Sequence, residues 1–174
     1  KGLPRGIAFR LVEAGGVLDR RLVERDLTAL SQQERRTLKT FGVRLGAHSV
    51  WLPEVLKARG KALAQAHAGE RLAPAAAGLT ALSETPPAAR TLSAHGLRAV
   101  GRWAAPVEAL ERMAELRAAG KGLLSEAALA ELGWTEPQAK QVLTALKGVR
   151  SDVEPPRQPV KDSRQRLPAL RIIQ

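Results

Sequence analysis

The sequence predicts an all-α fold, with a short β element near residues 43–52 and a helix-turn-helix-like unit at 125–147. Apolar residues recur at three- and four-residue intervals along most of the chain, which is the spacing of one helix face. Two segments also carry capping boxes, in which a Ser or Thr and a Glu or Gln three residues later satisfy each other's backbone N–H groups. The apolar share of 44% is ordinary for a globular core, so the chain should fold.

The first part of the chain is predicted to form helices separated by glycines. The first helix spans Pro4 to Ala14, and the glycine pair after it tolerates the left-handed conformation that closes a helix. A capping box of Ser31 and Glu34 starts another helix, which reaches Phe41. Between them, a short helix from Arg20 to Leu30 has an amphipathic spacing of Leu22, Val23, Leu27 and Leu30.

Basic residues and special backbone positions concentrate between Arg35 and Leu56. β-Branched and bulky residues follow Gly42 and Gly46, and they favour a short extended piece over a helix. Pro53 then opens a helix, since its fixed φ and missing N–H suit the first helical turn. That helix has one apolar side and one basic side, and the basic side is formed by Lys57, Arg59 and Lys61.

Composition divides the chain into four parts. Residues 1–70 are helical, and residues 71–95 form a connector of Pro, Ala, Ser and Thr with few large apolar groups to order it. Residues 96–150 are helical again, and residues 151–174 form an extended basic arm that contains several prolines. The first residue is Lys1 rather than Met, so we expect a fragment of a longer protein.

Three helices are predicted in the second helical part. The first runs from Pro106 to Gly120 and carries an outward pair of Glu108 and Arg112. The second follows a Ser125 cap, and the third starts at a Thr and Gln capping box at 135–138. The last helix shows a polar face of Lys140, Gln141, Thr144 and Lys147.

The charge balance predicts an acidic partner. The chain carries 28 basic and 17 acidic residues, so its net charge is +11, and nucleic acid is the commonest partner of such a chain. The alternative is a genome bias toward arginine, because 20 of the basic residues are Arg and 8 are Lys. No cysteine is present, which excludes disulfides and thiolate zinc sites and agrees with a reducing, cytoplasmic compartment. No stretch approaches the roughly 18 to 20 apolar residues of a membrane span.

Sequence motifs of catalysis are absent. The lysines after Gly60 and Gly120 lack the upstream glycine and the following hydroxyl residue of a phosphate-binding loop. The three histidines, His48, His67 and His95, are far apart and have no carboxylate at metal-ligand spacing. The sequence therefore predicts no enzyme activity, no metal site and no cofactor in this chain.

Four short segments, in this order, resemble one protein family. They are Gly16 to Arg20 (GVLDR), Gly42 to Pro53 (GVRLGAHSVWLP), Gly96 to Gly101 (GLRAVG) and Leu110 to Leu116 (LERMAEL). Each is similar to part of the region after the ATPase core in the DExH-type superfamily 2 RNA helicases of the mitochondrial degradosome, in their bacterial branch. The chain departs from the pattern at 106–108, where Pro-Val-Glu replaces the usual Arg-Val-Asp, so a role of that arginine does not carry over.

The resemblance implies a helical accessory region that packs on two RecA-like motor domains and helps enclose single-stranded RNA or DNA. The motor would lie outside this chain and would bind ATP and magnesium, and a partner from RNA degradation is also implied. Phosphates would be held by basic side chains, and a base would stack on the tryptophan of the second segment. The candidate nucleic-acid-binding residues are Arg36, Lys39, Arg44, His48, Trp51, Lys57, Lys61, Lys140 and Lys147.

Other interpretations remain open at this stage. The basic face would serve equally well to dock the chain against an acidic protein or against its own motor domains. The helix pair at 125–147 is also a candidate for duplex DNA, because lysines and amides contact phosphates and base edges. Arg44 has a structural alternative, in which it bonds backbone carbonyls that shape its turn. Base-stacking modules such as RRM or OB folds are not expected, because we place in the core most of Phe9, Phe41, Trp51, Trp103 and Trp134.

Overall fold

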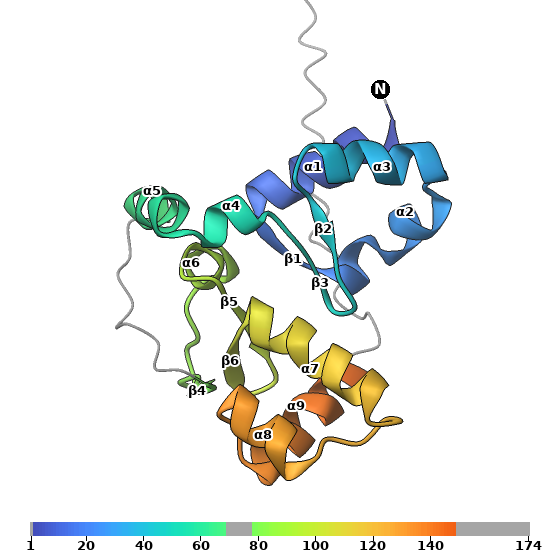
Figure 1. Cartoon of the computed structure of the whole chain (residues 1–174). Helices are drawn as coiled ribbons and strands as arrows, with labels where there is room; N and C mark the ends of the chain where they lie inside the picture. Colours follow the sequence, from blue (N-terminus) through green and yellow to red (C-terminus); the bar gives the residue numbers. More distant parts are fainter. Residues whose placement is uncertain (1, 69–77, 149–174) are drawn as a thin grey trace, which may run out of the picture.

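Two three-stranded antiparallel sheets make this a mixed α/β fold, so the predicted all-α class is wrong (Figure 1). The structure is a computed structural model that describes residues 2–68 and 78–148. Every strand is two to four residues long. Such short segments do not show the two-residue alternation by which a strand is recognised in a sequence. The fold class was therefore predicted from the helical periodicity alone.

The first sheet has the strand order β1-β3-β2 and contains the predicted extended piece. The central strand is β3 (Ser49–Trp51), which lies between β1 (Val17–Asp19) and β2 (Arg44–Leu45). The register places Trp51 directly opposite Arg44, so the two side chains lie on the same face of the sheet.

Four helical segments lie beside this sheet, and the capping box predicted at Ser31 and Glu34 is formed in full. One prediction is wrong, because Leu22 is exposed rather than on the buried face. It lies in a 3-10 helix, which has three residues per turn, so the α-helical spacing does not say which of its side chains face the core. The segments are α1 (Leu3–Glu13), η1 (Arg20–Val23), α2 (Glu24–Ala29) and α3 (Gln32–Thr40). Together with the sheet they bury Ile7, Leu11, Leu18, Val23, Leu27, Leu30, Leu38, Val43 and Val50.

The basic amphipathic helix that was predicted next consists of two helices, α4 (Pro53–Leu56) and α5 (Ala58–Ala68). Between them the backbone of Lys57 is extended, with ψ at 156°. Gly60 approaches α4 so closely that a Cβ there would overlap the carbonyl oxygen of Glu54. Close packing of the two helices therefore replaces the single straight helix.

The second sheet has the strand order β4-β6-β5, with β6 (Trp103–Pro106) in the centre. Its edges are β4 (Thr80–Ala81) and β5 (Leu97–Val100), and α6 (Ala89–Ala94) precedes β5. Both β4 and α6 fall within residues 71–95, where the sequence predicted a connector. Burial stabilises α6 as a helix, because the residues of its last turn, including Leu92, are almost fully enclosed.

The three helices predicted in the second half are confirmed as α7 (Val107–Ala119), α8 (Glu126–Leu132) and α9 (Glu136–Gly148). Ser125 caps α8, and Thr135 and Gln138 bond each other's backbone N–H groups at the start of α9. These helices and the second sheet bury Val100, Ala105, Leu110, Met113, Leu132, Trp134, Ala139 and Val142.

The outward ion pair predicted on α7 does not form. Arg112 instead bonds Glu131 of α8 at 2.6 Å and Glu115 at 2.9 Å, and Glu108 takes no part. The reason is tertiary: α8 packs against α7 and brings a carboxylate closer to the guanidinium than the predicted helical neighbour.

The aromatic residues are less buried than the sequence suggested. Phe9 is 64% exposed and Phe41 is 73% exposed, so the expectation that they belong to the core is wrong. Trp51 and Trp103 are half-buried, and Trp134 alone of the five is a core residue. Helical spacing did not reveal this, because Phe9 lies on the outer side of α1 and Phe41 follows the last residue of α3.

Two of the predicted segments lie outside the described residues, namely 71–77 of the connector and the basic arm at 151–174. Within the described parts of the chain, no helix combines the length and the apolar character needed to cross a membrane.

Replacing Ser31 with Ala should lower the free energy of unfolding by about 1 kcal/mol, because the N–H of Glu34 loses the acceptor that caps α3. Urea denaturation followed by circular dichroism measures the change. The matched control is Gln32→Ala, one residue along, which should stay within about 0.5 kcal/mol of the wild type. Equal losses in the two variants would show that the cap contributes nothing.

Candidate nucleic-acid interface

The turn from Gly46 to Ser49, here called the 46–49 turn, joins β2 to β3. It lies where the first half of the molecule, residues 2–68, meets the second half, residues 78–148 (Figure 1). Arg98 of β5 donates a hydrogen bond to the backbone carbonyl of His48. The same guanidinium bonds Ser49 Oγ at 3.1 Å and forms an ion pair with Asp19 of β1 at 3.0 Å. Arg98 is only 8% exposed, so its charge serves an internal contact.

Glu111 of α7 holds the same turn from the other side. Its carboxylate accepts hydrogen bonds from the backbone N–H of Ala47 at 2.6 Å and from that of His48 at 3.1 Å. The residue is 9% exposed, and these donors satisfy the hydrogen-bonding capacity that its carboxylate would otherwise lose at that depth. The turn is therefore held from both sides: the Arg98 guanidinium bonds one of its carbonyl groups, and the Glu111 carboxylate bonds two of its N–H groups.

Gly46 makes this approach possible. A Cβ at this position would overlap both the Glu111 carboxylate and the ring of Trp51, so no other residue fits without displacement. The carbonyl of Gly46 accepts a hydrogen bond from Arg20 at 2.8 Å, and Arg20 also pairs with Glu24. We call Asp19, Arg98, Glu111 and the 46–49 turn the central polar cluster.

The electrostatics of the cluster favour a charged Asp19 and a neutral His48. Burial acts to raise the pKa of Asp19, but bonds from Arg21 and the charge of Arg98 outweigh it and leave the pKa lowered. Burial lowers the pKa of His48, and the nearby Glu111 only partly opposes this. Asp19 is thus ionised at neutral pH, and His48 is uncharged.

The central polar cluster draws residues from all four segments that carry the family resemblance. Asp19 belongs to the first segment, the 46–49 turn to the second, Arg98 to the third and Glu111 to the fourth. Sequence reasoning missed these contacts because their partners lie far apart in the chain, 79 residues for Asp19 and Arg98 and 64 for Ala47 and Glu111. A signal was available in the third segment, where a single arginine interrupts the apolar run at 97–100.

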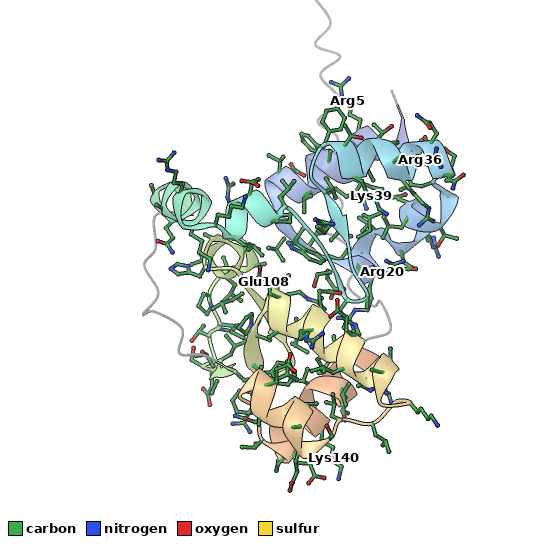
Figure 2. The ribbon with its side chains drawn as sticks, in the orientation of Figure 1. Arg5, Arg20, Arg36, Lys39, Glu108 and Lys140 are labelled. Atoms are coloured by element: carbon green, nitrogen blue, oxygen red, sulfur yellow. The ribbon has the colours of Figure 1, made fainter. Side chains whose placement is uncertain are left out.

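A groove of about 470 Å³ runs between the first sheet and α7, and we call it the candidate groove. Lys39 of α3, Arg44 of β2 and Trp51 of β3 form one wall. Figure 2 shows Arg36 and Lys39 extending from the same helix, on which they are three residues apart. The structure thus brings together three of the residues predicted to bind nucleic acid, with a fourth nearby on the same helix.

These basic side chains are not used to hold the fold together. Among the residues that the structure describes, the side chains of Arg36, Lys39 and Arg44 form no hydrogen bond or ion pair. The alternative in which Arg44 bonds backbone carbonyls is therefore not formed in the described residues. Arg44 is exposed opposite the half-buried indole of Trp51, so a cation and an aromatic ring lie side by side.

The other wall of the candidate groove is acidic, and its charges have partners. Glu111 and Glu115 line it, together with small residues of α7. Glu111 bonds the 46–49 turn, and Glu115 pairs with Arg112 at 2.9 Å, a guanidinium that it shares with Glu131. An anion in the groove would approach the cationic wall and lie against alanines on the other side.

The remaining predicted residues lie elsewhere. Lys57 pairs with Glu54 at 2.5 Å, and Lys61 packs beside Gly96. His48 has its backbone carbonyl and N–H in the central polar cluster. Lys140 and Lys147 are exposed on α9, and Figure 2 shows Lys140 at the end of the molecule opposite Arg36.

The described parts of the chain contain no group of three or more His, Asp or Glu side chains that would hold a metal ion. In comparisons with known proteins, no family model, no curated protein and no solved structure matches this chain.

Replacing Glu111 with Ala should lower the free energy of unfolding by about 2 to 3 kcal/mol, because two buried N–H groups lose a charged acceptor. The control is Glu108→Ala, on the same helix but exposed and unbonded in the described residues, and it should change stability by less than about 0.5 kcal/mol. Urea unfolding curves of both variants give the comparison. A small effect at Glu111 would mean that the halves are held together by other contacts.

His48 should make the protein less stable in mild acid. Its pKa is lowered below the usual 6.5 in the folded chain, so as pH falls the unfolded chain takes up the proton first. The stability due to the neutral imidazole is complete above pH 6.5 and is lost as pH falls through that value. Unfolding in urea at pH 7.5 and 5.5 should show a smaller fall for His48→Gln than for the wild type. An identical fall in both would rule out this role.

Proposed function

We propose that this chain is the nucleic-acid-binding accessory region of an ATP-dependent helicase, and that it holds single-stranded RNA or DNA in the candidate groove. The observation that carries the proposal is the pairing of Lys39 and Arg44, which have no ion pair among the described residues, with the half-open indole of Trp51. Cations attract phosphates and an indole stacks on any base, which is the combination used by sequence-tolerant single-strand binders.

The distribution of charge supports placing the ligand on the first half. Residues 2–68 contain 12 basic and 6 acidic residues, a net charge of +6. Residues 78–148 contain 8 basic and 7 acidic residues, a net charge of +1. The cationic excess of the described chain is thus concentrated in the half that contributes α3, β2 and β3 to the candidate groove.

The chain has no catalytic part in this proposal. ATP and magnesium belong to RecA-like motor domains outside it, and these domains are its first protein partners, with an RNA-degradation enzyme as a further one. A cytoplasmic location is part of the same proposal. Because the contacts are phosphates and stacked bases, binding should depend strongly on salt and little on sequence.

A protein-docking role is the second candidate, and exposed apolar residues on the outer side of the first half favour it. Phe9 and Val12 are one turn apart on α1, and each is about two-thirds exposed, at 64% and 66%. Phe41 is also exposed at the end of α3. Such residues suit an apolar partner surface, and they are separate from the cations of the candidate groove.

Duplex DNA is a weaker candidate than the sequence suggested. Gln141, in the middle of the supposed recognition face of α9, accepts a hydrogen bond from the indole of Trp103 at 2.8 Å. The turn between β5 and β6 also lies against Ala145 on α9. These contacts leave α9 without the continuous free face that enters a major groove.

The double variant Lys39→Glu, Arg44→Glu should bind a fluorescein-labelled oligouridine at least about tenfold more weakly than the wild type, in fluorescence-anisotropy titrations at two salt concentrations. The magnitude of the slope of log affinity against log salt should fall by about 1.4, because two phosphate contacts to a single strand are lost. The charge-matched control is Arg90→Glu, Lys121→Glu, at exposed positions outside the candidate groove, which should lose little. An equal loss in the control would show that only net charge matters.

A further inference from the structure

We propose a second nucleotide subsite, on the second half of the molecule, in a groove between the β5–β6 turn and α9. It rests on the proposed function for the class of its ligand, a single-stranded nucleic acid, and it uses different residues. The groove has a volume of about 430 Å³ and is lined by Arg102, Trp103, Lys140, Gln141, Thr144 and Ala145. We call it the α9 groove.

The floor of the α9 groove is fixed by close packing. Gly101 has a positive φ of 58°, and a Cβ there would lie only 3.0 Å from the Cβ of Ala145. Glycine therefore lets the β5–β6 turn lie directly on α9. Trp103 follows this turn as the first residue of β6, and its indole N–H donates a hydrogen bond to Gln141 Oε1 at 2.8 Å. This hydrogen bond fixes the orientation of the indole in the absence of a ligand.

The indole of Trp103 is positioned but not buried. Trp134 is 4% exposed and belongs to the core of this half, whereas Trp103 is only half-buried. The guanidinium of Arg102 lies 5.5 Å from the centroid of the Trp103 ring, which is a cation–π distance. A base can stack against this preformed pair of planar groups without reorganising the protein.

The charges around the ring suit a phosphate. Arg102 and Lys140 have no ion pair among the described residues, and none of the six lining residues is acidic. Gln141 accepts from Trp103 through its oxygen, which leaves its amide nitrogen as a donor. Lys147, exposed seven residues and about two turns further along α9, lies in the direction in which a strand would continue.

An acidic peptide fits the α9 groove less well than a nucleotide. Extended peptides commonly bind by adding a strand to a free sheet edge, and Trp103 lies on β6, the central strand of its sheet. The backbone of β6 already pairs with β4 and β5, so a peptide would find no ladder to extend. Stacking and phosphate contacts need no backbone partner.

The test uses tryptophan fluorescence of the full chain in a Trp51→Phe background, where Trp103 and the buried Trp134 remain. Unlabelled oligouridine should quench the emission in a saturable way, and the quench should vanish in the Trp51→Phe, Trp103→Phe variant. In the otherwise wild-type chain, Arg102→Ala, Lys140→Ala should weaken binding of labelled oligouridine about fivefold to tenfold by anisotropy. Its control, Arg90→Ala, Lys121→Ala, should bind as the wild type does, and thermal melting should confirm that all variants fold.

The outcomes separate this subsite from the candidate groove. If Lys39→Glu, Arg44→Glu loses binding while Arg102→Ala, Lys140→Ala binds normally and no quench occurs, the α9 groove is not a subsite and the proposed function stands. If the quench and the Arg102 and Lys140 losses occur while the candidate-groove variant binds normally, only the α9 groove binds. No binding in any arm overturns both. Quenching by a polyglutamate peptide but not by oligouridine would overturn the subsite in favour of an acidic protein partner.

Discussion

The enclosure of the 46–49 turn by Arg98 and Glu111 is the contact on which the rest of the molecule depends. A buried charge is costly unless it is paired and hydrogen-bonded, and here each charge contacts groups of opposite full or partial charge. The guanidinium meets a carbonyl and Asp19, and the carboxylate meets two N–H groups. Because Arg98 lies on the second sheet and Glu111 on α7, the turn is enclosed only when both elements lie against the first sheet. The same arrangement brings α7 against the first sheet and so creates the candidate groove.

The net charge of +11 does not by itself say which cations meet a ligand. Several arginines use their guanidinium groups to bond backbone carbonyls, and Arg10, Arg20 and Arg98 thereby join parts of the chain that are 12 or more residues apart. This group consists of Arg10, Arg20, Arg35, Arg98 and Arg117. A guanidinium suits this work because it offers five donors in a fixed plane, which an ammonium group does not. Part of the arginine excess is therefore structural, and neither a ligand nor genome composition is needed to explain that part.

Local features of the fold could be predicted from the sequence, and non-local ones could not. The capping boxes at Ser31 and Thr135 were correct because both partners lie within three residues of each other. The extended piece near 43–52 was predicted, but β1 and the second sheet were missed because their strands are short and because their pairing is decided by tertiary contacts. Asp19 and Arg98 are 79 residues apart, and no spacing rule connects them. For the candidate site, the basic segment was singled out from its local composition, but this did not separate Lys39, which lines the candidate groove, from Lys57, which is paired locally.

Two similar segments show why burial, rather than motif, decides the role of an arginine. Arg44 and Arg98 each lie two residues after a glycine with positive φ, and each occupies a short strand. Arg98 is buried because its strand meets the other half of the molecule, where Asp19 offers a carboxylate and the 46–49 turn offers a carbonyl. Arg44 has no such neighbour in the described residues; its cross-strand partner is Trp51, and it lines an open groove. Under the proposed function, an anionic, planar ligand such as a nucleotide would pair with this cation and stack on its aromatic neighbour.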